Sequence, residues 1–355
     1  MSEVISFDVN KRVCVVVDTN VWYSETLLDT PAGLSLVYTL GKQGAVLGLP
    51  EVIETEIMKQ LVRLGNEAAA DYAKAAQTLK HFTGVDAFAA PSADQVEKAV
   101  AKKLRDIDRV VERVPITVEH TRAALVMVNA ELPPNSHKNQ QFKDSLIWQA
   151  ILTLAKKYSV HFVTADFAFY QDRNKLEKGL AKNLQEESRC VNANIDLHFD
   201  LSSCVIALQG QPPSFDQTPL RTFIIEHTLP KLRIEAKRQR CTLGEPWKLK
   251  LNVFRTVKAD NFAVEFTMTG TWELEQTDLV NRHAKRIAKA YGGCFYNIVN
   301  GTISEFYVQR VGLLYKSDGG SGSILRSFEN DDESNPFHRR IEFLDHWLGD
   351  TGFDR

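Results

Sequence analysis

Two short apolar runs near the N-terminus both lead to an acidic residue. Val13–Val17 is almost entirely β-branched and is followed by Asp18, and Val160–Thr164 is followed two residues later by Asp166. A continuous apolar run of this length is typical of a strand that is buried on both faces, as in a parallel sheet. Because such strands need helices on both sides, we expect strands and helices to alternate along this part of the chain.

Helical patterns lie between and around these runs. Asp29–Pro31 predicts the start of a helix, residues 45–49 predict a second strand, and Pro50 opens another helix. Residues 66–113 are expected to be mostly helical, and an apolar stripe predicts a further helix over residues 145–157. This order predicts βαβ units with right-handed crossovers and a parallel sheet.

A segment rich in residues that end regular structure, residues 210–219, divides the chain and is the expected linker. A length of 355 residues favours two domains. We predict an α/β domain over residues 1–209 and a smaller α+β domain over residues 220–355. Apolar and polar residues alternate over 247–253 and 262–268, which predicts an antiparallel sheet in the second domain.

Composition and motifs disfavour several functional classes. The 43 basic and 45 acidic residues give a formal charge of −2, so the whole chain is not polybasic. No apolar run approaches the ~18–20 residues that span a bilayer, and the acidic N-terminal segment argues against a secretory signal. The five cysteines are widely spaced without a CxxC pair, which disfavours a disulfide framework and predicts a cytoplasmic protein. HExxH and P-loop motifs are missing, which disfavours a zinc hydrolase and a nucleotide-binding P-loop.

Four acids stand where a ligand site is expected. Asp18 and Asp166 follow strands, Asp144 begins a helix, and Glu56 lies on the helix after Pro50. Ligands of open α/β sheets bind at the carboxyl ends of the strands. Two carboxylates ~5 Å apart repel by about 3 kcal/mol at an effective dielectric constant of ~20, so such a cluster must bind protons or a cation. Hard divalent cations prefer oxygen ligands and can activate water beside a phosphoryl group.

The segments around these acids resemble, in the same chain order, the four motifs of PIN-domain nucleases: residues 15–21, 49–57, 142–148 and 162–167. The third segment resembles larger bacterial members in particular, and the resemblance covers roughly residues 10–205. It implies a three-layer α/β/α fold around a central parallel sheet. It also implies a metal-dependent endoribonuclease with Mg²⁺ or Mn²⁺ as cofactor, and a bacterial toxin, stress or defence effector as its setting. The implied catalytic and metal-binding residues are Asp18, Glu56, Asp144 and Asp166.

Neighbouring residues are candidates for supporting this site. Glu56 is preferred to Glu54, which points about 200° away on an ideal helix. Lys138 and Lys143 are close to Asp144 in sequence and are candidates for phosphate contacts. Hydrogen bonds to the acids, or ordinary turn and cap roles, are expected for four further residues: Thr19, Asn20, Ser145 and Thr164.

A basic segment is a separate candidate for binding nucleic acid. Residues 221–258 contain ten basic and three acidic residues, and Arg282, Lys285, Arg286 and Lys289 follow at helical spacing. Such clusters attract phosphate backbones, although a solvated helix face and strand is an equally open interpretation. The selected candidates are Lys237, Arg238, Arg240, Lys248 and Lys250.

Two other functions remain open. A catalytically inactive PIN-fold module would bind RNA or protein without turnover. A phosphatase would use Asp18 as its nucleophile, but that pattern expects a second Asp where Asn20 stands. Expected partners are an RNA substrate and an inhibitory or regulatory protein, without a membrane. The sequence leaves the oligomeric state open, a homo-oligomer included.

Overall fold

The computed structural model describes residues 11–25, 27–171, 179–210, 212, 214–274, 285–316 and 324–328. Contacts between Cα atoms divide the chain into two compact units. The N-terminal unit comprises residues 1–28 and 36–208, and the C-terminal unit comprises residues 29–35 and 209–355. The parts of the predicted second domain beyond residue 328 lie outside the described residues.

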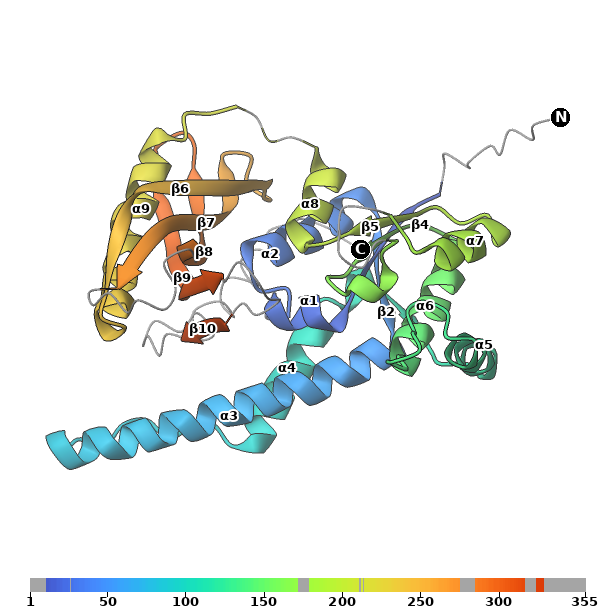
Figure 1. Cartoon of the computed structure of the whole chain (residues 1–355), viewed down its shortest axis with the longest axis horizontal. Coiled ribbons are helices and arrows are strands. Elements are labelled where there is room, and N and C mark those ends of the chain that lie inside the picture. The colour runs from blue at the N-terminus through green and yellow to red at the C-terminus, as the bar shows by residue number, and fades with distance from the viewer. Residues whose placement is uncertain are drawn as a thin grey trace. The chain divides into compact units, whose positions relative to one another are not determined.

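A five-stranded parallel sheet forms the centre of the N-terminal unit (Figure 1). The strand order is β3-β2-β1-β4-β5, so β1 is in the middle and the chain crosses over it between β3 and β4. Cys14, Val15, Val16 and Val17 of β1 are fully buried, as the apolar run predicts. The strands are β1 (Val13–Val17), β2 (Val46–Pro50), β3 (Val111–Val114), β4 (Ser159–Val163) and β5 (Ile195–His198).

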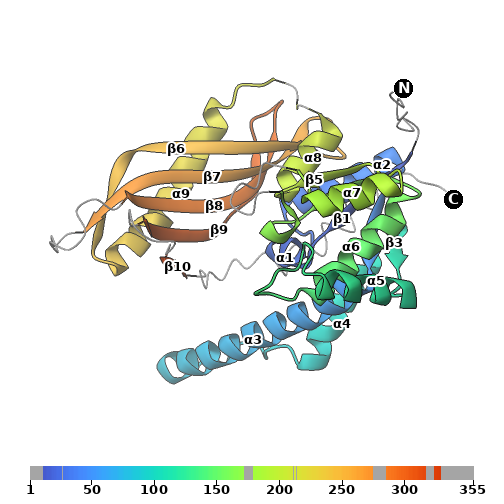
Figure 2. The ribbon, with the colours of Figure 1, turned by 45° about the vertical axis from the view of Figure 1, so that its right-hand side comes forward.

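Helices lie on both faces of this sheet. α6 contacts β2, β3 and β4 on one face, where α3 and α5 pack against it, while α8 and the end of α2 lie on the other face (Figures 1 and 2). The predicted three-layer α/β/α fold is therefore confirmed. The helices are α1 (Thr19–Ser24), α2 (Pro31–Gln43), α3 (Glu51–Thr83), α4 (Ala93–Asp106), α5 (Val118–Asn129), α6 (Phe142–Ala155), α7 (Lys182–Cys190) and α8 (Leu201–Gln209), with short 3-10 turns η1 (Asp108–Val110) and η2 (Phe167–Phe169).

The expectation of helix up to residue 113 is wrong at its end. α4 stops at Asp106, and Val111–Val114 forms the edge strand β3, with Val111 opposite Leu47 of β2. The apolar stripe of α4 continues in sequence to Val111, so periodicity alone favoured helix there. The edge of β2 offers backbone hydrogen bonds to this segment, which contains two valines. This tertiary pairing makes residues 111–114 a strand instead of a continuation of the helix.

A glycine permits close approach of α6 to the sheet. A Cβ atom at Gly48 of β2 would lie 2.5 Å from Cδ1 of Leu154, and 2.9 Å from both Sγ of Cys14 and Cγ2 of Val16. A side chain at this position would require the side chain of Leu154 to rotate or α6 to move away from the sheet. This contact fixes the height of α6 above the sheet, and α6 carries Asp144 in its first turn.

The C-terminal unit is a five-stranded antiparallel sheet with one long helix, which confirms the predicted α+β class (Figure 2). The helix is α9 (Thr218–Arg238), and the strands are β6 (Cys241–Arg255), β7 (Asn261–Leu274), β8 (Lys285–Asn297), β9 (Ile303–Lys316) and β10 (Ile324–Phe328). Lys285, Arg286 and Lys289 lie on β8, so the helical spacing proposed for them is wrong, while Arg282 lies outside the described residues. Among the described residues, no helix is both long enough and apolar enough to cross a membrane.

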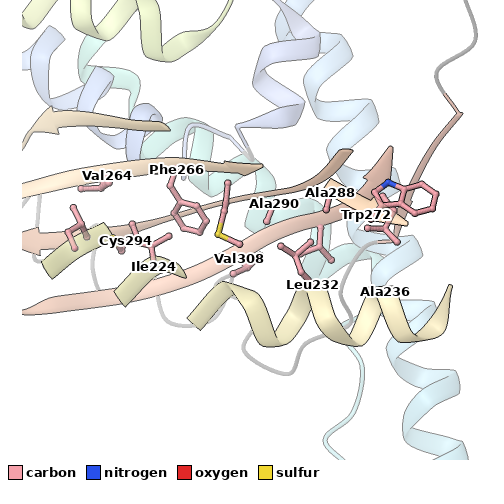
Figure 3. Packing of buried hydrophobic residues seen from close by; sticks show 14 of the residues in the cluster. Ile224, Leu232, Ala236, Val264, Phe266, Trp272, Ala288, Ala290, Cys294 and Val308 are labelled. Atoms are coloured by element: carbon pink, nitrogen blue, oxygen red, sulfur yellow. The ribbon is translucent and has the colours of Figure 1, made fainter. Parts of the chain in front are cut away.

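The core of the C-terminal unit lies between α9 and one face of its sheet (Figure 3). Ile224 and Leu232 of α9 are fully buried there, as are Val264 and Ala290 of the strands. Because side chains alternate along a strand, the residues between these core positions point to the opposite face. This alternation determines where the basic residues of β6 are placed.

Substituting Gly48 by alanine is expected to destabilise the N-terminal unit by about 1–3 kcal/mol, because the new methyl group overlaps Leu154 and Cys14. Gly41 in α2 is the matched control, since a Cβ atom there meets nothing within 4 Å. Gly41→Ala should stabilise by about 0.5–1 kcal/mol through its higher helix propensity. Urea denaturation measures both effects, and equal stability of the two variants would contradict this packing.

Candidate active site

The four predicted acids line one pocket of the N-terminal unit. The pocket has a volume of about 460 Å³, and its lining residues are Asp18, Thr19, Asn20, Glu56, Gln140, Gln141, Phe142, Lys143, Asp144 and Asp166. Asp18 and Asp166 come from the ends of β1 and β4, Glu56 comes from the first turns of α3, and Asp144 comes from the first turn of α6. The pocket therefore lies at the carboxyl edge of the sheet, where the connections from β1 and β4 diverge.

Asp18 is held at the junction of β1 and β4. Its backbone N–H donates to the carbonyl of Val163 at 2.9 Å. Its carboxylate accepts hydrogen bonds from the backbone N–H of Thr19 and from the hydroxyl of Thr164, each at 2.7 Å. Asp18 is only 4% exposed. These bonds fix the carboxylate orientation, and the second one ties it to the strand that leads to Asp166.

Asp166 and Glu56 are also oriented by hydrogen bonds. The carboxylate of Asp166 accepts from the backbone N–H of Ala168 at 2.8 Å and from the side-chain amide of Gln141 at 3.2 Å. The carboxylate of Glu56 accepts from Gln60 at 3.1 Å and from Lys143 at 3.4 Å. In both cases a neighbouring donor fixes the acid within the pocket.

Glu54 faces away from these acids. The guanidinium of Arg113 donates to both of its oxygens, at 3.0 and 3.1 Å. This arrangement leaves Glu56 as the acid that α3 presents to the pocket, and it makes Glu54 a natural control residue.

Asp144 differs from the other three acids in its hydrogen bonding. Among the described residues, none donates a hydrogen bond to its carboxylate, although the side chain is half-buried. Burial, with the charges of Asp18, Asp166 and Glu56, raises the pKa of Asp144 to about 7. Burial also raises the pKa of Asp18 to about 6, against the opposing effect of its two hydrogen bonds. The pocket thus resists full ionisation unless a cation compensates its charge.

These residues fit a hard divalent cation. The donors are carboxylate oxygens from two helices, α3 and α6, and from the segments after β1 and β4, and each acid lines the same cavity. Among the described residues that line the pocket, Lys143 is the sole basic side chain, so one positive charge faces four acids. Mg²⁺ and Mn²⁺ prefer such oxygen donors.

The predicted supporting residues take different places. Thr19 bonds Asp18 through its backbone, and its hydroxyl lies 3.5 Å from Glu56. Thr164 bonds Asp18, Asn20 lines the pocket, and Lys143 contacts Glu56. Lys138 is exposed on the turn before α6 and does not line the pocket.

Ser145 supports the loop before α6 rather than an acid. Its hydroxyl donates to the carbonyl of Gln141 at 3.0 Å and accepts from the side chain of Asn135 at 2.8 Å. Asn135 is 1% exposed, and its side-chain oxygen accepts from the backbone N–H of Gln141 at 2.7 Å. This network places Gln141 beside Asp166. The sequence carries no motif for Asn135 or Gln141, which follow the Pro133-Pro134 pair in a polar segment.

The basic candidates of the C-terminal unit fall into two groups. Lys237 and Arg238 end α9, and Arg240 follows in the turn to β6. Lys248 and Lys250 are exposed on β6 and alternate with Leu249 and Leu251, which pack against the core beneath α9. The two lysines therefore lie on the sheet face opposite to α9.

Comparison with known proteins supports the identification of the N-terminal fold. Residues 15–169 match the family model described as PIN domain. No curated protein and no solved structure matched the chain. The chain therefore contains a PIN domain, and the matched region extends from β1 to η2, so it includes all four acids. PIN domains are generally nucleases that use divalent metals.

Neutralising Asp144 is expected to change the pH dependence of stability in the absence of divalent cations. The pKa of Asp144 is raised from 3.8 to about 7 in the folded chain. The folded state therefore binds more protons than the unfolded state between about pH 4 and pH 7, so the free energy of unfolding falls as pH rises through that window. Asp144→Asn should reduce this fall and exceed wild type in stability at about pH 8 by on the order of 1–2 kcal/mol, measured by urea denaturation in EDTA.

The matched control is Asp71→Asn on α3, whose side chain is 75% exposed. Its free energy of unfolding should stay within about 0.5 kcal/mol of wild type at each pH. An Asp144→Asn variant that is less stable than wild type throughout the range would contradict the proposed crowding of charges.

Proposed function

We propose that this protein is a metal-dependent endoribonuclease that hydrolyses RNA phosphodiester bonds. The proposal rests on the convergence of Asp18, Glu56, Asp144 and Asp166 on one pocket whose described lining residues include one lysine. The PIN-domain match supports nuclease chemistry, while RNA as substrate and a role as a toxin, stress or defence effector rest on the sequence resemblance. A cytoplasmic location and an inhibitory or regulatory protein partner belong to the same proposal.

The four acids would hold Mg²⁺ or Mn²⁺, which lowers the pKa of a bound water and stabilises charge on a phosphoryl group. Asp18 is kept in one orientation by Thr19 and Thr164, so its carboxylate needs little rearrangement to bind a cation. Asp144 accepts no hydrogen bond from the described residues, so its carboxylate oxygens are available to a cation. Lys143 contacts Glu56 at the pocket and can attract a phosphate.

The exposed part of the sheet face opposite to α9 is the surface that we assign to RNA contact. Register places Lys250 opposite Thr267, Thr267 opposite Tyr291, and Tyr291 opposite Arg310. Lys250, Tyr291 and Arg310 of this row are exposed. Lysine and arginine attract phosphates, and an exposed tyrosine can stack on an unpaired base. A second candidate surface for RNA contact lies at the end of α9 and in the turn to β6. It consists of Lys237, Arg238 and Arg240.

Glu56→Gln is expected to lower the rate of RNA cleavage by at least about 100-fold, because it removes one negative oxygen donor from the pocket. Cleavage of labelled RNA in Mn²⁺ measures the effect, and EDTA should abolish the wild-type reaction. Glu54→Gln is the matched control on the same helix, because Glu54 bonds Arg113 instead. Its rate should equal that of wild type.

Two outcomes of this assay would contradict the proposal. Equal cleavage rates for wild type and Glu56→Gln would show that Glu56 is not needed for the reaction. A folded wild-type protein that binds RNA but cuts none in Mn²⁺ would instead identify an inactive binding module.

Replacing both Lys248 and Lys250 by alanine should weaken RNA binding and flatten its salt dependence. Loss of two phosphate contacts is expected to reduce the slope of log K against log salt by about 1.4 for a single strand. Fluorescence anisotropy with labelled single-stranded RNA in chelator measures the slope. The control removes Lys74 and Lys98, which form exposed ion pairs on α3 and α4. Equal slope changes in both double variants would reject a specific surface.

A further inference from the structure

A second group of potential metal ligands lies in the N-terminal unit, on the sheet face beneath α8. Nδ1 of His161 on β4 is 2.8 Å from Nε2 of His198 on β5, and the two rings stack with centroids 5.1 Å apart. Cys204 of α8 completes the group, and the potential ligand atoms of all three residues lie within 4.8 Å of one another. None of these residues lines the carboxylate pocket.

Strand register and a helix cap bring the three residues together. His161 is opposite Asp196 and Val163 is opposite His198, so the imidazoles and Asp196 share one face of the sheet. α8 begins directly after β5, and Asp200 caps its first turn by accepting from the backbone N–H of Ser203 at 2.7 Å. This start directs Cys204 toward the sheet, where it is fully buried.

The chemical state of these groups suits a borderline-soft cation. Burial lowers the pKa of both His161 and His198, so both imidazoles are neutral and carry a basic nitrogen. Burial raises the pKa of the Cys204 thiol, so a thiolate needs an adjacent positive charge to form there. Two neutral imidazoles and one cysteine are among the commonest donors for zinc.

We propose that His161, His198 and Cys204 bind one Zn²⁺ ion, with the carboxylate of Asp196 as fourth ligand. Oδ2 of Asp196 lies 3.9 Å from Nδ1 of His161, and its side chain is 55% exposed, which gives the ion a path of entry. Ligand atoms around tetrahedral zinc are about 3.3–3.6 Å apart, so the ligand atoms of His161, His198 and Cys204, which lie within 4.8 Å of one another, need shifts of only about 1 Å by side-chain rotation. One thiolate and one carboxylate balance the charge of the ion, so the occupied site is neutral and suited to burial.

The role of this ion is structural. It would join β4, its neighbour β5 at the edge of the sheet, and α8, which brings Cys204 to both strands. The carbonyl of His198 accepts from the backbone N–H of Thr164 at 2.9 Å, and Thr164 in turn bonds Asp18. Zinc would therefore stabilise the strand end on which the carboxylate pocket depends, without taking part in its chemistry.

Cobalt(II) provides a direct test, because zinc is spectroscopically silent. The full chain is stripped of metal and titrated with Co²⁺, which zinc displaces from such sites. We expect one equivalent of Co²⁺ to produce a thiolate-to-cobalt charge-transfer band that Zn²⁺ abolishes. Cys204→Ser should lose the band, and Cys190→Ser, which replaces an exposed free cysteine, should keep it. A double Asp18→Asn and Asp144→Asn variant should keep it too, which separates this site from the carboxylate pocket.

A second variant keeps the test decisive if Cys204→Ser does not fold. His198→Gln should retain the band only at far higher Co²⁺ concentrations, with affinity reduced by more than about 100-fold. Zn²⁺ should raise the unfolding temperature of wild type but not that of His198→Gln. Folded wild-type protein without a charge-transfer band would overturn the proposal, as would a band of equal strength in Cys204→Ser.

Discussion

Electrostatic repulsion among four buried or half-buried carboxylates is the constraint on which the N-terminal unit depends. Asp18 and Asp166 are brought together by neighbouring parallel strands, and Glu56 and Asp144 by helices that begin at the same edge of the sheet. Hydrogen bonds from Thr19, Thr164 and Gln141 orient the acids but do not neutralise them. The fold therefore maintains a pocket that favours the binding of cations or protons. A loss of stability through repulsion of this kind is typical of functional sites.

Features of the pocket that are encoded within a few consecutive residues could be predicted from the sequence. Features that depend on tertiary contacts could not. A buried strand that ends at an acid is visible within six residues, so β1 with Asp18 and the place of Asp166 after β4 could be predicted. Pairing of Val111 with Leu47 depends on an open strand edge 64 positions away, and the helical period concealed it. Asn135 acts through a tertiary network with Ser145 and Gln141, for which no motif exists.

The same distinction applies to the other candidate surfaces. His161, His198 and Cys204 lack the close spacing of zinc motifs, and they meet only because β4 and β5 pair in one register and α8 folds back. The basic segment looked continuous in sequence, yet strand alternation separates Lys248 and Lys250 from the residues at the end of α9. The two proposed metal sites differ in chemistry, since one offers only oxygen donors and the other offers nitrogen and sulfur donors together with one carboxylate.

Anomalous scattering from crystals soaked in Mn²⁺ would show whether the four acids hold a cation, because it locates the ion without requiring the RNA substrate. We expect a manganese peak in the pocket, within bonding distance of Asp18 and at least two of the other three acids. An intact crystal at saturating Mn²⁺ with no peak in the pocket, or with the acids paired to basic side chains instead, would contradict it.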